Sequence, residues 1–222
     1  MKFRREAAKR VFAKEFNASK YKIGGEGEKE AVYVLTPLGL KCNRLFIIGA
    51  LIEKEEIKPD SEMWRIRVAD PTGSFLGFIG KFQPEALDSI TEISVPSTVA
   101  ITAKAKLFER GERAIPLLRP ETINVSDFDA RDYWIVETAK ATLRRIKMME
   151  SGENEFRIAR EKYNPDLQEY KKMVAEVILK LKGEIEVLES EKEEVSEDVE
   201  RFEEILENHS IEEEILELKD LD

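Results

Sequence analysis

The chain has 222 residues, of which 42% are hydrophobic, and this is enough apolar material for a folded core. Its one cysteine, Cys42, excludes an internal disulfide and a cysteine-based zinc site, and its one histidine, His209, lies in an acidic region, which excludes a Ser–His–Asp triad in the folded body. The formal net charge of −10 is unevenly distributed, because residues 183–222 hold 18 acidic and 3 basic residues, so the first 182 residues carry +5. This asymmetry favours a nucleic-acid partner for the basic part, although acidic tails also occur merely for solubility.

An amphipathic helix is predicted over residues 2–18, with a basic and solvated opposite face. The apolar residues that recur there at helical spacing are Phe3, Ala7, Val11, Phe12 and Phe16. The following GGEGEK, at 24–29, lacks the Lys-Ser/Thr ending of a P-loop and is predicted to be a linker. Residues 1–36 are therefore interpreted as a basic helix with its linker.

A β-rich domain is predicted over residues 37–126. Its first strand contains LFIIGALI at 45–52, where Gly49 indicates a bulge or sharp bend. The later strands are predicted at 63–69, 75–82, 98–108 and 114–125, with DPTG at 70–73 as a turn and a helix at 84–93. Five strands with one helix between the third and the fourth are typical of an OB-fold, a small Greek-key barrel, whereas an SH3-like barrel does not usually contain that helix.

Helices are predicted after the barrel. Asp127 or Asp129 can cap a helix over 127–150, whose apolar stripe we interpret as a subunit interface, with packing on its own barrel as the alternative. The stripe consists of Ile135, Val136, Ala139, Leu143, Ile146 and Met149. Residues 151–222 are interpreted as an acidic helical region, in which a heptad seam from Val174 to Leu206 predicts a coiled coil.

Basic and aromatic residues alternate with the expected core positions of the strands. Lys104, Lys106 and Phe108 share the outward face of the fourth strand, opposite apolar residues such as Ile101 and Ala103. Two of the three residues Phe75, Phe78 and Phe82 are expected in the core, as is Trp64. Cations neutralise phosphates and rings stack on unpaired bases, so this pattern predicts binding of single-stranded nucleic acid. The candidate residues are Arg65, Arg67, Lys81, Phe82, Lys104, Lys106, Phe108, Arg110 and Arg113.

Three stretches of the chain carry a resemblance to a known family. LFIIGALI, WRIRVADPTGSFLGFIGKF and TAKAKLFERGERAIPLLRPETI resemble the OB domain of the middle subunit of replication protein A, above all the archaeal RPA-associated proteins. The resemblance covers roughly residues 1–150 and includes RREAAKRVFAKEF and ARDYWIVETAKATLRRI. It implies that Phe108 stacks on a base, that a second aromatic lies near Lys81 or Phe82, and that the helix after the barrel joins a bundle of subunits. The winged-helix domain that ends many relatives has no counterpart in the charged segment after Met149.

The sequence therefore predicts a non-enzymatic, single-stranded DNA-binding subunit of an archaeal replication protein A complex, acting in DNA replication, repair and recombination. The expected partners are single-stranded DNA, other replication protein A subunits and, through the acidic tail, replication or repair proteins. No cofactor, metal or membrane is expected, and the expected location is the cytoplasm, with the nucleoid. Two alternatives stay open: an adaptor subunit that barely contacts DNA, and an OB module for RNA, because stacking does not distinguish the sugars.

Overall fold

The computed structural model describes residues 6–25, 31–59, 61–111 and 113–184. Residues 1–178 form one compact unit, and the packing described below lies within it. Of the second unit, residues 179–222, only the helical residues 179–184 are described. The heptad seam predicted from Val174 onward therefore lies mostly outside the described residues. In the described part, no helix combines the length and the apolar character needed to cross a bilayer.

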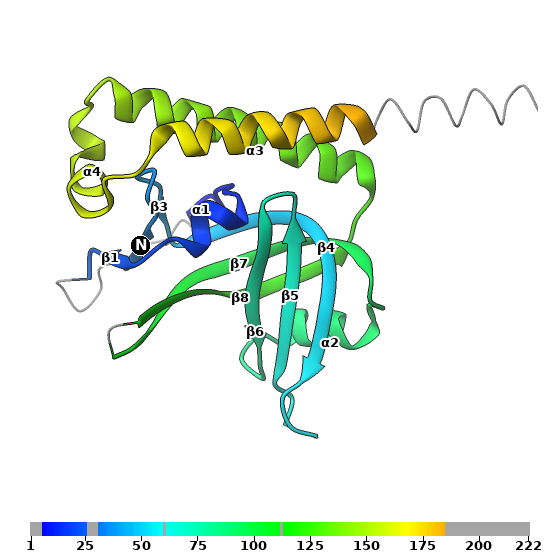
Figure 1. Ribbon diagram of the computed structural model, residues 1–222. Coiled ribbons are helices and arrows are strands. Elements are labelled where there is room, and N and C mark those ends of the chain that lie inside the picture. Colours follow the sequence, from blue (N-terminus) through cyan, green and yellow to red (C-terminus); the bar gives the residue numbers. More distant parts are fainter. Residues whose placement is uncertain (1–5, 26–30, 60, 112, 185–222) are drawn as a thin grey trace, which may run out of the picture. The chain divides into compact units, whose positions relative to one another are not determined.

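A closed five-stranded barrel forms the centre of the first unit (Figure 1). Its strands are β4 (Arg44–Glu56), β5 (Trp64–Asp70), β6 (Gly73–Ile79), β7 (Ser97–Arg110) and β8 (Arg113–Val125), in the order β4-β5-β6-β8-β7. The sheet is antiparallel except where β6 meets β8, and β4 pairs with β7 to close it. Helix α2 (Pro84–Glu92) connects the third barrel strand to the fourth. This is the strand order and helix position of an OB-fold, so the predicted fold class is confirmed.

Alternating side chains and one glycine explain why these strands close. In β5, Ile66 and Val68 are fully buried, while Arg65 and Arg67, which alternate with them, face outward. Gly49, in the long strand β4, approaches the backbone of β5 so closely that a Cβ there would lie 2.3 Å from the carbonyl oxygen of Ala69. The β4–β5 register then shifts between Leu51 and Glu53, so the predicted bulge lies just after this glycine.

The N-terminal helix is much shorter than predicted. Helix α1 covers only Ala13–Asn17, because the preceding residues run beside the first barrel strand. There Lys9 N donates to Arg44 O, and Phe46 N donates to Lys9 O, both at 2.9 Å. A small sheet that was not predicted from the sequence follows, made of β1 (Tyr21–Ile23), β2 (Tyr33–Leu35) and β3 (Lys41–Cys42). Most of the predicted linker at 24–29 lies outside the described residues.

The DPTG turn has a second structural role besides joining β5 to β6. Asp70 Oδ2 accepts a hydrogen bond from Ala13 N at 2.7 Å, and Thr72 Oγ1 accepts one from Lys14 N at 3.0 Å. Both donors belong to the first turn of α1, whose amide groups have no partner within the helix. The turn therefore caps α1 and fixes it on the barrel.

Helix α3 (Phe128–Glu150) begins where predicted, since Asp127 Oδ1 accepts a hydrogen bond from Ala130 N at 2.7 Å. Trp134 Nε1 donates to Phe46 O at 2.8 Å, which attaches the helix to β4. Arg145 donates to Glu15 Oε2 at 2.6 Å, and Thr36 donates to the other oxygen of this fully buried carboxylate. The helix is therefore bound to both the barrel and the N-terminal segment.

Most of the α3 stripe, which was interpreted as a subunit interface, is covered by the chain itself. Ile135, Ala139, Ile146 and Met149 are buried within the chain, Val136 is half-buried, and only Leu143 is exposed. One reason is the chain's own helix that begins at residue 167, after η1 (Asn154–Phe156) and α4 (Arg157–Tyr163), and runs beside α3 (Figure 1). Lys171 Nζ lies 2.6 Å from Glu150 Oε1. The residues of this helix that are buried in the first unit are Tyr170, Met173, Val174 and Val177.

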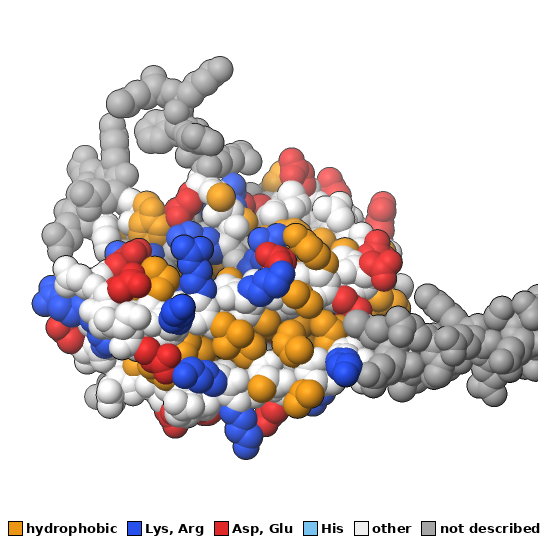
Figure 2. All heavy atoms as spheres, turned by 90° about the horizontal axis from the view of Figure 1, so that it is seen from above, with side chains coloured by type: hydrophobic (Ala, Val, Ile, Leu, Met, Phe, Trp, Pro, Cys, Tyr) orange, Lys and Arg blue, Asp and Glu red, His pale blue; other side chains and the backbone are white. Residues whose placement is uncertain are grey.

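Some apolar side chains still reach the surface of this helical side of the molecule (Figure 2). On the helices after the barrel, the exposed ones in the first unit are Phe128, Tyr133, Leu143, Ile158 and Ile178. Of the six residues predicted to form a subunit interface, Leu143 alone, 46% exposed, belongs to this set.

Candidate nucleic-acid interface

The outward faces of β7 and β8 form one ladder of basic and apolar side chains. In register, Lys104 lies opposite Arg119, Lys106 opposite Leu117, and Phe108 opposite Ile115. The residues that alternate with them, Ala103, Ala105 and Leu107 on β7 and Leu118 on β8, are buried in the barrel. Phe108 is 55% exposed, as its position out of phase with the core residues predicted. The alternation therefore brings Lys104, Lys106 and Phe108 together on one surface.

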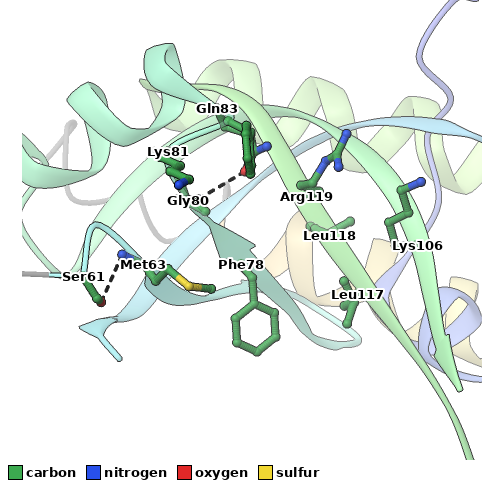
Figure 3. A pocket seen from close by; sticks show the side chains of 12 residues that line it. Ser61, Met63, Phe78, Gly80, Lys81, Gln83, Lys106, Leu117, Leu118 and Arg119 are labelled. Atoms are coloured by element: carbon green, nitrogen blue, oxygen red, sulfur yellow. Dashed lines mark hydrogen bonds between the residues drawn. The ribbon is translucent and has the colours of Figure 1, made fainter. Parts of the chain in front are cut away.

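A hollow of about 560 Å³, which we call the Phe78 hollow, adjoins this ladder (Figure 3). Met63, Phe78 and Leu117 supply apolar lining, and Figure 3 shows Phe78 and Leu117 projecting to the same side of their strands. Lys106 and Arg119 line it from β7 and β8, and Lys81 lines it from the end of β6. An apolar hollow with cations on its border fits a flat base joined to a phosphate.

The lysines and the arginine of this surface have no acidic partner among the residues that the structure describes. Within the described residues, no carboxylate oxygen lies within 4.0 Å of Lys104, Lys106 or Arg119. Burial lowers the pKa of Lys106 below its usual range, and the neighbouring charges of Arg119, Lys104 and Lys22 lower it further. An anion beside this cluster would favour the protonated form of Lys106 and offset the repulsion between the positive charges.

Phe82 is the most exposed large aromatic side chain of the described residues, at 82%. It follows the end of β6 in a turn where Gly80 N donates to Gln83 Oε1 at 3.1 Å. Lys81 Nζ lies 5.4 Å from the centre of its ring. Of the two positions considered for the second aromatic, the structure exposes a ring at Phe82 and places a cation against it.

Arg65 and Arg67 differ from the other candidate bases because carboxylates hold both of them. Arg65 Nη2 lies 2.7 Å from Glu53 Oε1 and 2.5 Å from Glu55 Oε2, and Arg67 Nε lies 3.2 Å from Glu53 Oε2. Hydrogen bonds from Arg65 and then Arg67 lower the pKa of Glu53, which keeps this carboxyl group ionised at neutral pH. These two arginines thus differ from Lys104, Lys106 and Arg119, which have no carboxylate partner among the described residues.

The last two candidate residues lie at the tip of the β7–β8 hairpin. Arg110 pairs with Arg113 in the ladder, and Gly111 forms the turn with φ of 61°, a conformation that favours glycine. Arg113 is exposed, and the side chain of Arg110 lies outside the described residues. Lys22 Nζ lies 3.1 Å from Glu109 Oε2, which attaches this end of the hairpin to β1.

Several residues of this surface were not predicted from the sequence. Arg119 and Leu117 were not selected, although Pro116, Leu118 and Pro120 alternate with them as buried residues. Of the three phenylalanines discussed for the third strand, only Phe75 is in the core, because Phe78 is half-buried in the hollow and Phe82 is exposed. Trp64 is also only half-buried, with Lys54 Nζ 5.6 Å from its ring centre. Strict alternation on β8 was the available signal for Arg119.

No family model and no curated protein matches this chain. Among solved structures, it is similar to a chain of a replication protein A heterotrimer bound to single-stranded DNA, with 12% identity and a TM-score of 0.45, over 63% of this chain and 98% of the other. It is also similar to Rim1, a mitochondrial single-stranded DNA-binding protein from S. cerevisiae, with 20% identity and a TM-score of 0.31, over 38% and 92%. A third similarity is to the OBody AM1L10 bound to hen egg-white lysozyme, with 11% identity and a TM-score of 0.32, over 39% and 81%.

Proposed function

We propose that this protein binds single-stranded DNA, without catalysis, on the outward surface of β7 and β8 and at the end of β6. One observation carries the proposal: Lys104, Lys106 and Arg119 are neighbours on two paired strands, and no described carboxylate neutralises them. Like charges placed side by side in a sheet are destabilising, so a stable fold that keeps them fits an anionic ligand.

The rings that flank these cations favour an unpaired strand. Phe108 and Phe82 are 55% and 82% exposed, and an exposed ring can stack only on a base whose face is free. Each such contact contributes about 1–3 kcal/mol without reading the sequence. In a duplex the base faces are already stacked, so the rings add affinity for single strands only. Phosphate contacts and ring contacts together support a sequence-tolerant single-strand site.

Fluorescence anisotropy of the purified chain with a labelled thymidine oligonucleotide tests the proposal. Binding is expected at low salt, and log K is expected to fall by about 0.7 per phosphate contact for each tenfold rise in salt. A hairpin duplex of the same charge serves as the competitor control. Absence of binding, or equal competition by the duplex, would refute the proposal. An unlabelled uridine oligonucleotide as a competitor in the same assay measures the preference between DNA and RNA, because stacking on rings does not by itself distinguish the two sugars.

We further propose that the protein works as a subunit of an archaeal replication protein A complex in DNA replication, repair and recombination. The resemblance of residues 1–150 to the middle subunit supports this role. The partner contact cannot use the whole predicted stripe, since four of its six residues are buried in the chain itself. Leu143 and Ile178, exposed on neighbouring helices, are the positions that we assign to it. Loss of co-purifying subunits from a Leu143→Asp variant with an unchanged melting temperature is the expected result, and unchanged assembly would contradict it.

A further inference from the structure

A second hollow, of about 360 Å³, lies next to the Phe78 hollow and shares Phe82, Gln83 and Arg119 with it. We call it the Arg44 hollow, because Arg44 lines it together with Lys104 and Arg119. Phe82 therefore borders both hollows. A strand that stacks a base on this ring places its next phosphate beside one hollow or the other.

Three basic side chains form a row across the sheet in this second hollow. Arg44 on β4 pairs in register with Lys104 on β7, and Lys104 pairs with Arg119 on β8. Direct cross-strand neighbours have their Cβ atoms about 4.5–5.5 Å apart, so this is one row of three positive charges. In addition, Arg119 Nε is buried and meets no hydrogen-bond acceptor within the described part of the chain. The row is built like an anion site.

Two carboxylates line this hollow, Glu85 on α2 and Glu121 on β8, and of the two only Glu121 forms an ion pair with the row among the described residues. Glu121 accepts from Arg44 in a two-point contact, with Nε–Oε2 at 2.7 Å and Nη2–Oε1 at 2.8 Å. This geometry is also the one in which an arginine holds two oxygens of a phosphate. Both side chains are partly exposed, at 18% for Arg44 and 25% for Glu121, so solvent reaches the pair. A phosphate that enters the hollow must therefore compete with Glu121 for Arg44.

We propose that the Arg44 hollow holds a phosphodiester of the bound strand beyond Phe82, and that Glu121 limits affinity by occupying Arg44 in the free protein. The inference rests on the proposed function, and it adds a second hollow and a residue that weakens binding. In this arrangement the Phe78 hollow holds a nucleobase of the bound DNA, and the row Arg44–Lys104–Arg119 contacts its phosphate backbone. The ligand chemistry is that of a phosphate diester rather than of a base.

Replacing the competing carboxylate is the sharpest test. In the full chain, Glu121→Gln is expected to tighten binding of a thymidine oligonucleotide about fivefold at low salt and to steepen the salt dependence by about 0.7, as one more phosphate contact requires. Glu137→Gln is the matched control, since it makes the same charge change at a carboxylate paired with Lys140 at 2.8 Å on α3. Melting temperatures are measured for both variants to confirm that each is folded.

A second variant identifies the arginine. Arg44→Gln combined with Glu121→Gln removes both partners and is expected to return the affinity to the parental value. Equal gains for Glu121→Gln and Glu137→Gln would overturn the inference, because the effect would then be one of net charge. A gain that persists in the double variant would overturn it too, because it would not run through Arg44. If the parent chain does not bind the oligonucleotide, the proposed function fails first and this inference falls with it.

Discussion

Two surfaces of the same barrel carry arginine or lysine side chains, and they differ in whether carboxylates pair with those side chains. On β4 and β5, Arg65 and Arg67 are held by Glu53 and Glu55. On β7 and β8, Lys104 and Lys106 have no acidic partner in the described part of the chain. A basic residue on a sheet therefore indicates a ligand only when the residue opposite it in the ladder is not an acid. Pairing across strands, which sequence position alone does not reveal, decides between the two cases.

The largest expected effect comes from replacing the basic side chains of each surface in turn, which tests directly whether the two surfaces differ. Lys104→Gln with Lys106→Gln is expected to weaken binding of a thymidine oligonucleotide on the order of 50-fold in low salt and to reduce the salt slope by about 1.4. Arg65→Gln with Arg67→Gln removes the same charge from the paired face and is expected to change affinity less than about fivefold, because those cations are already neutralised. Anisotropy titrations at several salt concentrations measure both effects. Equal losses in the two variants would mean that the faces do not differ.

The next effect concerns the rings. Phe108→Ala is expected to cost about 1–3 kcal/mol of binding free energy at every salt concentration, since stacking does not depend on counterions. Phe128→Ala is the control, because that ring is 62% exposed and has the guanidinium carbon of Arg131 5.0 Å from its centre, but it lies at the start of α3. The same titrations give both values. A loss as large for Phe128 as for Phe108 would show that the ladder is not the stacking surface.

Removing the carboxylate that pairs with Arg65 and Arg67 tests the same difference from the other side. Glu53→Gln releases two arginines at once, because this carboxylate contacts both of them. The expected gain in affinity is less than about twofold, since the two arginine side chains are 42% and 43% exposed and an ion pair in contact with solvent contributes little. Isothermal titration calorimetry resolves a change of this size. A gain as large as that expected for Glu121→Gln would extend the binding surface onto β5.

The smallest expected effect is a dependence of DNA affinity on pH that arises from Lys106 on β7. The pKa of Lys106 is lowered, so this group begins to lose its proton below the ordinary lysine value of 10.5. A bound phosphate favours the protonated form, and affinity is therefore expected to fall as pH rises toward that value. Lys106→Arg keeps its charge over this range, so its affinity is expected to begin falling at a higher pH. Identical pH profiles for the two proteins would contradict a role for the Lys106 charge.

The barrel was predictable because its strands alternate cleanly and its connections carry strong turn signals. Buried Ile66 and Val68 on β5, and the buried alternate positions of β7, fixed which side chains face outward, and Lys104, Lys106 and Phe108 followed from that. Arg119 was not predicted, although it alternates with the buried residues Leu118 and Pro120 on β8. The pairing of Arg65 with Glu53 could not be predicted without the register, which the bulge after Leu51 shifts.

The α3 stripe was misread for a different reason. Helical periodicity identifies an apolar face but does not say what covers it, and here the chain's own helix from residue 167 contributes to its cover. The N-terminal helix failed in the same way, because hydrogen bonds of Lys9 with β4 compete with helical ones and depend on residues far along the chain. Both errors concern tertiary contacts that override a local pattern.

The buried contact between Glu15 and Arg145 also sets an order of events during biosynthesis. The two residues are separated by 130 positions, and a ribosome that adds about 5–20 residues per second takes roughly 7–26 s to cover that distance. Throughout this interval the Glu15 carboxylate has no guanidinium to receive it, and burial of an unpaired charge is costly. All the barrel strands, which end at Val125, are synthesised before Arg145. The guanidinium that pairs with Glu15 is therefore synthesised only after all the barrel strands, so this buried ion pair is one of the later contacts of the fold to become possible.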